Sequence, residues 1–187
     1  TKVFAWWDVK RGRITVNSAS RSVCEDLLDL LRETLGSLKA TPLSTQTLPI
    51  RAMTTWVSDA QSRPANLQLG DKATLKAKGD DGKIAATQVD LDSDEIQQLL
   101  ESGRQATNLA ITIDERVSGV LTDSLQLKGL RFSDQLIEQA DHADDGDDAI
   151  ARLESDFFLM AHALSDTLDS LVHMLGGETV REVAAEK

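Results

Sequence analysis

The chain has 187 residues, and 41% of them are apolar, which is enough for one domain or two small ones around a hydrophobic core. No run of about 18 apolar residues occurs, so the sequence predicts no membrane-spanning helix. The one cysteine, Cys24, excludes an intramolecular disulfide and fits a reducing compartment. The chain opens in an apolar strand pattern without a secretory leader, and we expect a further segment to precede it.

The net charge of −11 argues by itself against a nucleic-acid partner, but the charge is unevenly distributed. Residues 1–63 carry nine basic and six acidic side chains, residues 64–132 carry eight and eleven, and residues 133–187 carry three and fourteen. The acidic side chains therefore gather near the C-terminus, and the rest of the chain holds enough cations for a basic face. These three segments are the domain organisation that we predict.

The first segment is predicted to be an α+β segment with a strand hairpin and a helix. The helix has an apolar stripe at helical spacing, which would make Cys24 a small core residue. Trp6 and Trp7 point to opposite faces of one strand, so one of them should be exposed unless it is covered. The expected elements are strands at 3–9 and 13–17, a helix from Ser18 or Ser20 to Gly36, and a strand at 50–57 that runs into a short helix.

The second segment is predicted to be mainly antiparallel β with one short helix. The alternation of Leu109, Ile111 and Ile113 indicates that one face of its sheet is buried. The expected elements are strands at 67–76, 83–91, 105–113, 116–122 and 125–132, and a helix at 94–102.

The third segment is predicted to be acidic and helical, with Phe157 and Phe158 as core residues rather than base-stacking platforms. The acidic run 141–148 lacks the alternating ligands and closing Glu of an EF-hand loop, so it is predicted to be a solvated linker. The expected elements are a helix at 134–140, a long helix from 149 to about 175 ended by Gly176 and Gly177, and a frayed tail from Glu178. The three segments together predict an α+β fold, in which antiparallel sheets are covered by helices.

No motif predicts catalysis or a bound cofactor. The chain has no glycine-rich phosphate loop, nucleophile elbow or paired catalytic carboxylates. His162 and His173 are eleven residues apart on one predicted helix, too far to share a metal ion. We therefore expect no catalytic residue, no metal and no cofactor.

Several stretches resemble the recombination-associated protein RdgC family, in order and at similar spacing, over nearly the whole chain. The stretch LQLKGLRF at 125–132 corresponds to a family stretch of the form S-L-K-R-L-K-F. The other stretches are NSAS at 17–20, LLRETLGSL at 30–38, TTWV at 54–57, SDEI at 93–96, TNLA at 107–110 and RLESDFFLM at 152–160. One departure stands out: a family strand of the form R-x-K-K-Q-D-L is replaced at 85–91 by AATQVDL, which loses three basic positions.

The resemblance implies a cytoplasmic, nucleoid-associated protein that is not an enzyme and forms a ring-shaped homodimer. It also implies binding of duplex DNA without sequence preference, and restraint of the RecA recombinase through occupation of the DNA. An alternative is an acidic protein-interaction or dimerisation module, with most of the DNA affinity in a preceding N-terminal segment. A hydrolase or metal enzyme is a third class, for which the chain has no motif.

Two groups of cations are the candidate DNA contacts. Arg104, Arg116, Lys128 and Arg131 fall on positions that are basic in the family, and Lys10, Arg11 and Arg13 gather at the tip of the predicted hairpin. Such cations release counterions from the phosphate backbone and bind any sequence. The simpler alternative for each group is a solvated strand face or pairing with nearby acids.

Strand geometry constrains the pair Lys128 and Arg131. Residues of equal parity share a face, so two residues three apart point the same way only where the strand has a bulge or bend. We therefore predict that at most one of them faces DNA, and favour Lys128, because Leu125 and Leu127 then fall on the other side. The acidic C-terminal segment should face away from the DNA.

Overall fold

The computed structural model describes residues 2–79, 82–142 and 149–179. Contacts divide the chain into two compact units, Thr1–Pro42 and Leu43–Lys187, which we call unit 1 and unit 2 and describe separately. The α+β class with antiparallel sheets, covering helices and a long C-terminal helix is confirmed. The division into three segments by charge and pattern stays a prediction.

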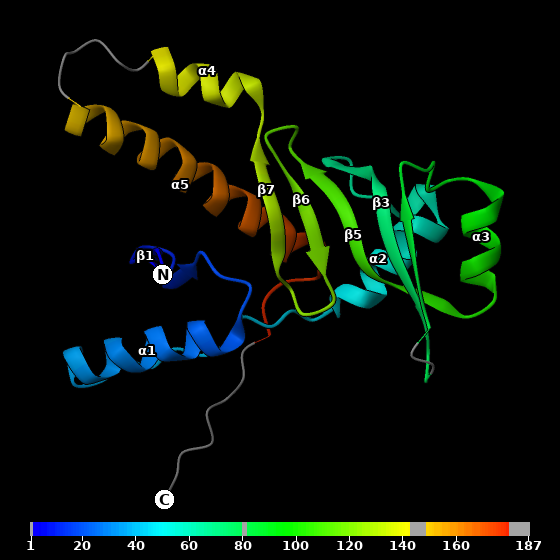
Figure 1. Ribbon diagram of the computed structural model, residues 1–187, viewed down its shortest axis with the longest axis horizontal. Helices are drawn as coiled ribbons and strands as arrows, with labels where there is room; N and C mark the ends of the chain where they lie inside the picture. The colour runs from blue at the N-terminus through cyan, green and yellow to red at the C-terminus, as the bar shows by residue number, and fades with distance from the viewer. Residues whose placement is uncertain (1, 80–81, 143–148, 180–187) are drawn as a thin grey trace, which may run out of the picture. The chain divides into compact units, whose positions relative to one another are not determined.

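Unit 1 consists of a β-hairpin and one helix (Figure 1). Strands β1 (Ala5–Asp8) and β2 (Arg13–Val16) pair antiparallel, and Trp6 is half-buried while Trp7 is exposed, as expected. Helix α1 (Arg21–Leu35) ends at Gly36, whose φ of 77° is the left-handed conformation that suits glycine. No residue of α1 is fully buried, and Cys24 is half-buried rather than in a core.

Unit 2 begins with a helix where the sequence suggested a strand running into a helix. Helix α2 covers Pro49–Ser58 and is followed by the 3-10 turn η1 (Ala60–Ser62). The strand prediction was wrong because Pro49 is pre-organised for the first helical turn. The buried residues Met53, Trp56 and Val57 also follow the three-to-four-residue spacing of a helix.

The centre of unit 2 is one antiparallel sheet with the strand order β4-β3-β5-β6-β7. The alternation in β5 is confirmed, because Leu109, Ile111 and Ile113 are all buried. The strands are β3 (Leu67–Ala77), β4 (Lys83–Thr87), β5 (Arg104–Ile113), β6 (Val117–Thr122) and β7 (Leu127–Phe132).

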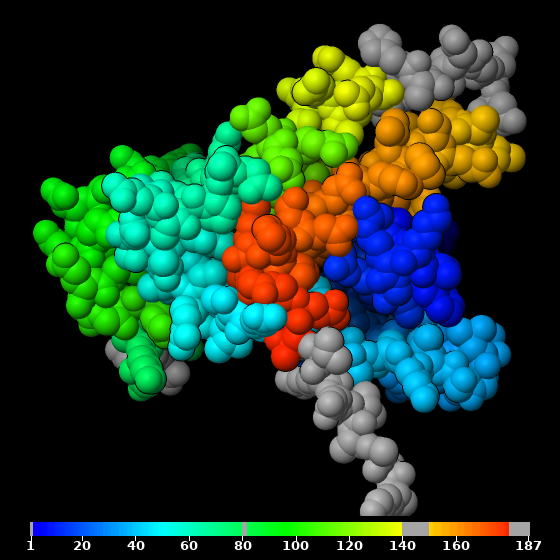
Figure 2. Space-filling model, turned by 180° about the vertical axis from the view of Figure 1, so that it is seen from behind, coloured from blue at the N-terminus to red at the C-terminus, as the bar shows by residue number. Residues whose placement is uncertain are grey.

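The helices of unit 2 cover one face of this sheet. In Figure 1 the sheet faces the viewer, with α2 and the C-terminal end of α5 behind it, and Figure 2 shows this helical side. The core joins Met53 and Trp56 of α2 and Leu171 of α5 to the buried residues of β3 and β5. The remaining helices are α3 (Asp94–Glu101), α4 (Asp134–His142) and α5 (Ala149–Met174). None of the helices in the described residues is long and apolar enough to cross a bilayer.

Helix α5 differs between its two halves. Its C-terminal half packs against β5 and β6, and Leu171, together with Leu175 directly after the helix, is buried there. In its first half Phe157 and Phe158 are 52% and 60% exposed, so the prediction that they are core residues was wrong. The apolar stripe runs along the whole helix, but the sheet underlies only the second half.

The predicted acidic linker begins inside a helix. Asp141 and His142 belong to α4, and residues 143–148 lie outside the described residues. Gly176 and Gly177 follow α5 with positive φ angles and end it, as expected, and the tail beyond Thr179 lies outside the described residues.

Candidate nucleic-acid interface

The second face of the sheet in unit 2, which we call the open face, carries small polar side chains and cations. Cross-strand partners share a face, so the register Ala85↔Thr74↔Asn108↔Thr122 places these four residues together. The neighbouring register Ala86↔Ala73↔Leu109↔Leu121 belongs to the core face. The strands therefore place mainly apolar residues against the helices and mainly short or cationic residues on the open face.

Five cations lie on the open face, and all are exposed. Lys76 pairs with Lys83, and Lys72 lies four residues before Lys76 on the same strand and therefore on the same face. Lys128 and Arg131 join this face through their partners Val120 and Ser118 in β6. No side-chain ion pair or hydrogen bond of these five is found among the described residues. Their charge is therefore available to an anionic partner.

A bulge in β7 brings Lys128 and Arg131 to the same face of the sheet, so the simple strand alternation by which we separated the two residues does not hold. Ser118 pairs with Arg131 and Val120 pairs with Lys128, so two residues of β7 lie opposite the single Gly119. The extra residue is accommodated at Gly129, whose φ of 60° suits glycine. A side chain at Gly119 would lie 3.1 Å from the backbone oxygen of Lys128 and 3.3 Å from the side chain of Leu130, so glycine also permits this close approach.

The other two family-basic positions lie elsewhere. Arg104 pairs with Ala77 on the register of the core face, at the end of β5, and donates a hydrogen bond of 3.3 Å to the backbone oxygen of Gly82. Arg116 lies in the turn between β5 and β6 and forms an ion pair of 3.6 Å with Asp166 of α5. For Arg116, the alternative to DNA contact given above, pairing with a nearby acid, matches the observed contact.

The hairpin cations belong to unit 1 and form a local group. Arg11 donates from its backbone N–H to Oδ1 of Asp8 at 3.0 Å and from Nη1 to Oδ2 at 3.2 Å. Arg13 is the cross-strand partner of the same aspartate, and Lys10 is exposed at the turn. The ion pair satisfies Arg11 within the hairpin and leaves Lys10 as its most accessible cation.

A shallow depression of about 300 Å³ lies at one end of the open face. Its lining includes Lys76, Lys83, Ala85 and Thr107. Asp123 is the one acidic residue of its lining, and its backbone N–H donates to the oxygen of Thr107 at 2.8 Å. The depression is therefore cationic with one opposing carboxylate.

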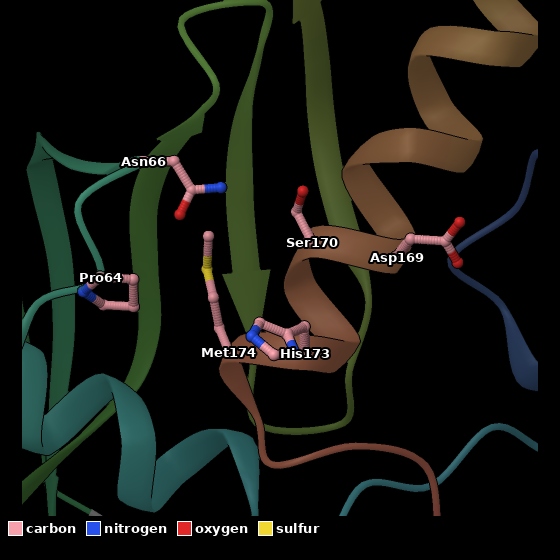
Figure 3. Close-up of a pocket in the computed structure, with 6 residues that line it drawn as sticks. All are labelled: Pro64, Asn66, Asp169, Ser170, His173 and Met174. Atoms are coloured by element: carbon pink, nitrogen blue, oxygen red, sulfur yellow. The ribbon is translucent and has the colours of Figure 1, made fainter.

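A second depression, of about 520 Å³, lies on the helical side, between the loop before β3 and the last turns of α5 (Figure 3). Its polar side chains brace the fold: Asn66 Nδ2 and Ser170 Oγ both donate to the carboxylate of Asp114, at 2.8 and 2.9 Å. Asp114 lies in the β5–β6 turn at a φ of 53°. Ser170 is therefore bonded to a carboxylate and not to His173, so this depression does not hold a serine nucleophile with its histidine base.

A bidentate ion pair braces the core side of unit 2. Arg63 donates to the backbone oxygen of Trp56 from Nε at 2.6 Å and to both carboxylate oxygens of Asp92. These hydrogen bonds lower the pKa of Asp92 below its ordinary value. Within the part of the chain that the structure describes, no three His, Cys, Asp or Glu residues lie close enough to hold a metal ion.

The sequence reasoning missed Lys72, Lys76 and Lys83, although a signal was present. Lys72, Thr74 and Lys76 alternate within the predicted strand 67–76, and strand periodicity places them on one face. The candidate strand cations were chosen at positions that are basic in the family, and this alternation was not considered.

Known proteins resemble this chain over most of its length. A family model described as "Putative exonuclease, RdgC" matches residues 1–178. The "Recombination-associated protein RdgC" of Pseudomonas fluorescens is 38% identical over 178 residues, which cover 95% of this chain and 58% of that protein. The proteins of the same name from Pasteurella multocida and Yersinia enterocolitica are each 40% identical, over 94% and 95% of this chain and 58% of their own length. The chain therefore spans less than two thirds of the length of these relatives.

Proposed function

Because this chain belongs to the RdgC family, we propose that it acts in DNA recombination and replication by binding duplex DNA without sequence preference, through the open face of its sheet. The observation that carries the proposal is the gathering of Lys72, Lys76, Lys83, Lys128 and Arg131 on that face. Lysine and arginine neutralise phosphates and release counterions whatever the base sequence.

The neutral side chains of the open face favour binding without sequence preference. Sequence is read when a helix or ribbon inserts side chains into a groove and contacts base edges. Between the cations the open face presents short residues such as Ala110, Thr112 and Ser118, on a broad sheet. Such a surface contacts the phosphate backbone and leaves base edges unread.

We further propose that the protein forms a ring-shaped homodimer, is associated with the nucleoid in the cytoplasm, and restrains RecA by occupying DNA. Self-association is supported by exposed apolar side chains on α4 and on the first half of α5. They are Ile137, Ile150, Leu153, Phe157, Phe158 and Met160. An exposed apolar group of this kind marks an interaction surface. The same side chains suit the alternative of a protein-interaction module, which predicts association without DNA affinity in this chain.

A salt-titrated binding assay on duplex DNA tests the proposal. The wild-type chain should bind unrelated sequences equally, and log K should fall with log salt with a slope of up to about −4.5 if all five cations neutralise phosphates. Replacing all five by Gln should remove most of this slope. A control variant in which three exposed cations outside the open face, Lys2, Lys39 and Arg51, are changed to Gln should keep it. Unchanged binding by the fivefold variant would contradict the proposal, and no DNA binding by the wild-type chain would favour the interaction module.

We also propose that the protein is not an enzyme, despite the exonuclease in the family description. A nuclease of the two-metal type needs a cluster of carboxylates around its ions. Incubation of end-labelled duplex with the chain and Mg²⁺ or Mn²⁺ should leave the strands at full length. Progressive shortening that tracks the purified protein would overturn this part of the proposal.

A further inference from the structure

The five cations of the open face form two rows with a neutral strip between them. We call Lys72, Lys76 and Lys83 the β3–β4 row, and Lys128 and Arg131 the β7 row. Strands β5 and β6 separate the rows. Neighbouring strands lie about 4.8 Å apart, so the rows are about 14 Å apart from β3 to β7 and about 19 Å from β4 to β7.

The strip between the rows carries no charged side chain at the open-face positions of β5 and β6. Its open-face residues in β5 and β6 are uncharged and, apart from Gln105, no longer than asparagine; they include Gln105, Asn108, Ala110, Thr112, Ser118 and Val120. Gly70 lets β3 approach the strip closely, because a Cβ there would lie 2.8 Å from the Cβ of Ala110. The strip therefore keeps the two rows apart and brings no cation between them.

The two rows come level with each other near the middle of the sheet. Ala110 pairs with Val120, and Val120 pairs with Lys128. Lys72 lies in the bulged part of β3 that is opposite Ala110, since Leu69 pairs with Ile111 and Ala73 pairs with Leu109. Lys72 and Lys128 therefore lie on opposite sides of the same point of the strip.

From this geometry we infer that the two rows contact different strands of one duplex, with the neutral strip laid across a groove. The major groove is about 12 Å wide and the minor groove about 6 Å wide between the backbones. A separation of about 14 to 19 Å suits the two backbones that border the major groove and is too wide for the minor groove. The inference rests on the proposed function and adds to it which phosphates each row contacts.

The experiment compares two duplexes of the same sequence, one with natural phosphates and one with uncharged methylphosphonate linkages throughout one strand. The full chain is used as wild type, as a β3–β4 row variant with three Lys→Gln changes, and as a β7 row variant with Lys128→Gln and Arg131→Gln. The off-face triple variant of Lys2, Lys39 and Arg51 is the control. The slope of log K against log salt is measured for each combination.

On the natural duplex the β3–β4 row variant should lose about 2.7 units of slope and the β7 row variant about 1.8 units. The half-neutral duplex has one charged strand. The β3–β4 row should bind that strand, because it has three cations and the β7 row has two. The β7 row variant should then bind the half-neutral duplex with the same slope as wild type.

A β7 row variant that loses the same slope on both duplexes would overturn the inference, because both rows would then contact one strand. Failure of the proposed function has a different result: the wild type would show no salt-dependent binding to the natural duplex. Loss of folding is recognised by circular dichroism, and restoration of the slope by Lys128→Arg with Arg131→Lys would show that charge at these positions carries the effect.

Discussion

The two faces of the sheet in unit 2 are made from the same strands and differ in what they contact. On one face Leu75, Leu109 and Leu121 are fully buried against helices. On the other face Lys76 and Lys128 are exposed and no helix packs over them among the described residues. Because the side-chain period of a strand is two, neighbouring residues lie on opposite faces, one in the core and one on the proposed DNA-binding face. Substitutions at neighbouring positions should therefore have unrelated effects.

The largest expected effect comes from adjacent residues of β5. Leu109→Ala creates a cavity beneath the helices and should lower the free energy of unfolding by about 2 to 5 kcal/mol. Asn108→Ala, on the open face, should change it by less than about 0.5 kcal/mol. Urea unfolding of both variants measures the difference, and similar losses would mean that the open face is also a packed surface.

A second prediction adds charge where the family strand pattern has it. Ala85 and Thr87 occupy positions of that pattern which are basic, and both lie on the open face beside Lys83. Ala85→Arg with Thr87→Lys should steepen the salt slope by about 1.8 units and leave unfolding nearly unchanged. Gln61→Arg with Gln98→Lys adds the same charge at exposed positions of η1 and α3. An equal gain in this control would show that net charge, and not the face, sets the affinity.

A third prediction concerns the bulge at Gly129. Because the bulge places Lys128 and Arg131 on one face, Lys128→Ala and Arg131→Ala should each lower the salt slope by about 0.9 unit, uniformly across sequences. Arg116→Ala, which removes an ion pair with Asp166, is the control and should leave the slope unchanged. A loss of slope for Lys128→Ala alone would indicate that only Lys128 contacts DNA, as simple strand alternation predicts.

The elements of unit 2 were predictable where the hydrophobic periodicity agreed with the glycines that end helices. Gly103 and the glycines after α5 end helices at positive φ, and the β5 alternation identified the buried face. The segment now seen as α2 was misread because its β-rich composition outweighed the proline that starts it. Phe157 was misread because periodicity shows that a helix has an apolar stripe and does not show how far the sheet beneath it extends.

The candidate interface was only partly predictable, for a reason of register. Lys128 and Arg131 were identified, but their common face depends on a bulge that the single glycine at 129 makes possible and does not require. Arg104 and Arg116 appeared equivalent to them in sequence, and only the strand ends and the partner Asp166 separate them. The five cations of the open face lie on three strands, so their common face depends on strand pairing, which the sequence of one strand does not determine.

The smallest expected effect on the free energy of unfolding comes from the ion pair between Arg63 and Asp92, on the helical side of the sheet. Asp92 has a lowered pKa because Arg63 donates to its carboxylate, so the folded chain releases this proton more readily than the unfolded chain. The resulting stabilisation is present above the unfolded pKa of about 3.9 and is lost as the pH falls through the folded value.

Asp92→Asn should therefore lower the free energy of unfolding at pH 7 by less than about 1 kcal/mol, since the carboxylate is largely exposed and screened by solvent. The difference from wild type should shrink as the pH falls below about 4. Urea unfolding at pH 7 and pH 3.5 measures it, with the Arg63→Lys background as control, because lysine cannot donate in the bidentate geometry. In that background the effect of Asp92→Asn should be smaller. A difference that grows as the pH falls would mean that the aspartate is held in its protonated form and that the ion pair is not what braces this side of the sheet.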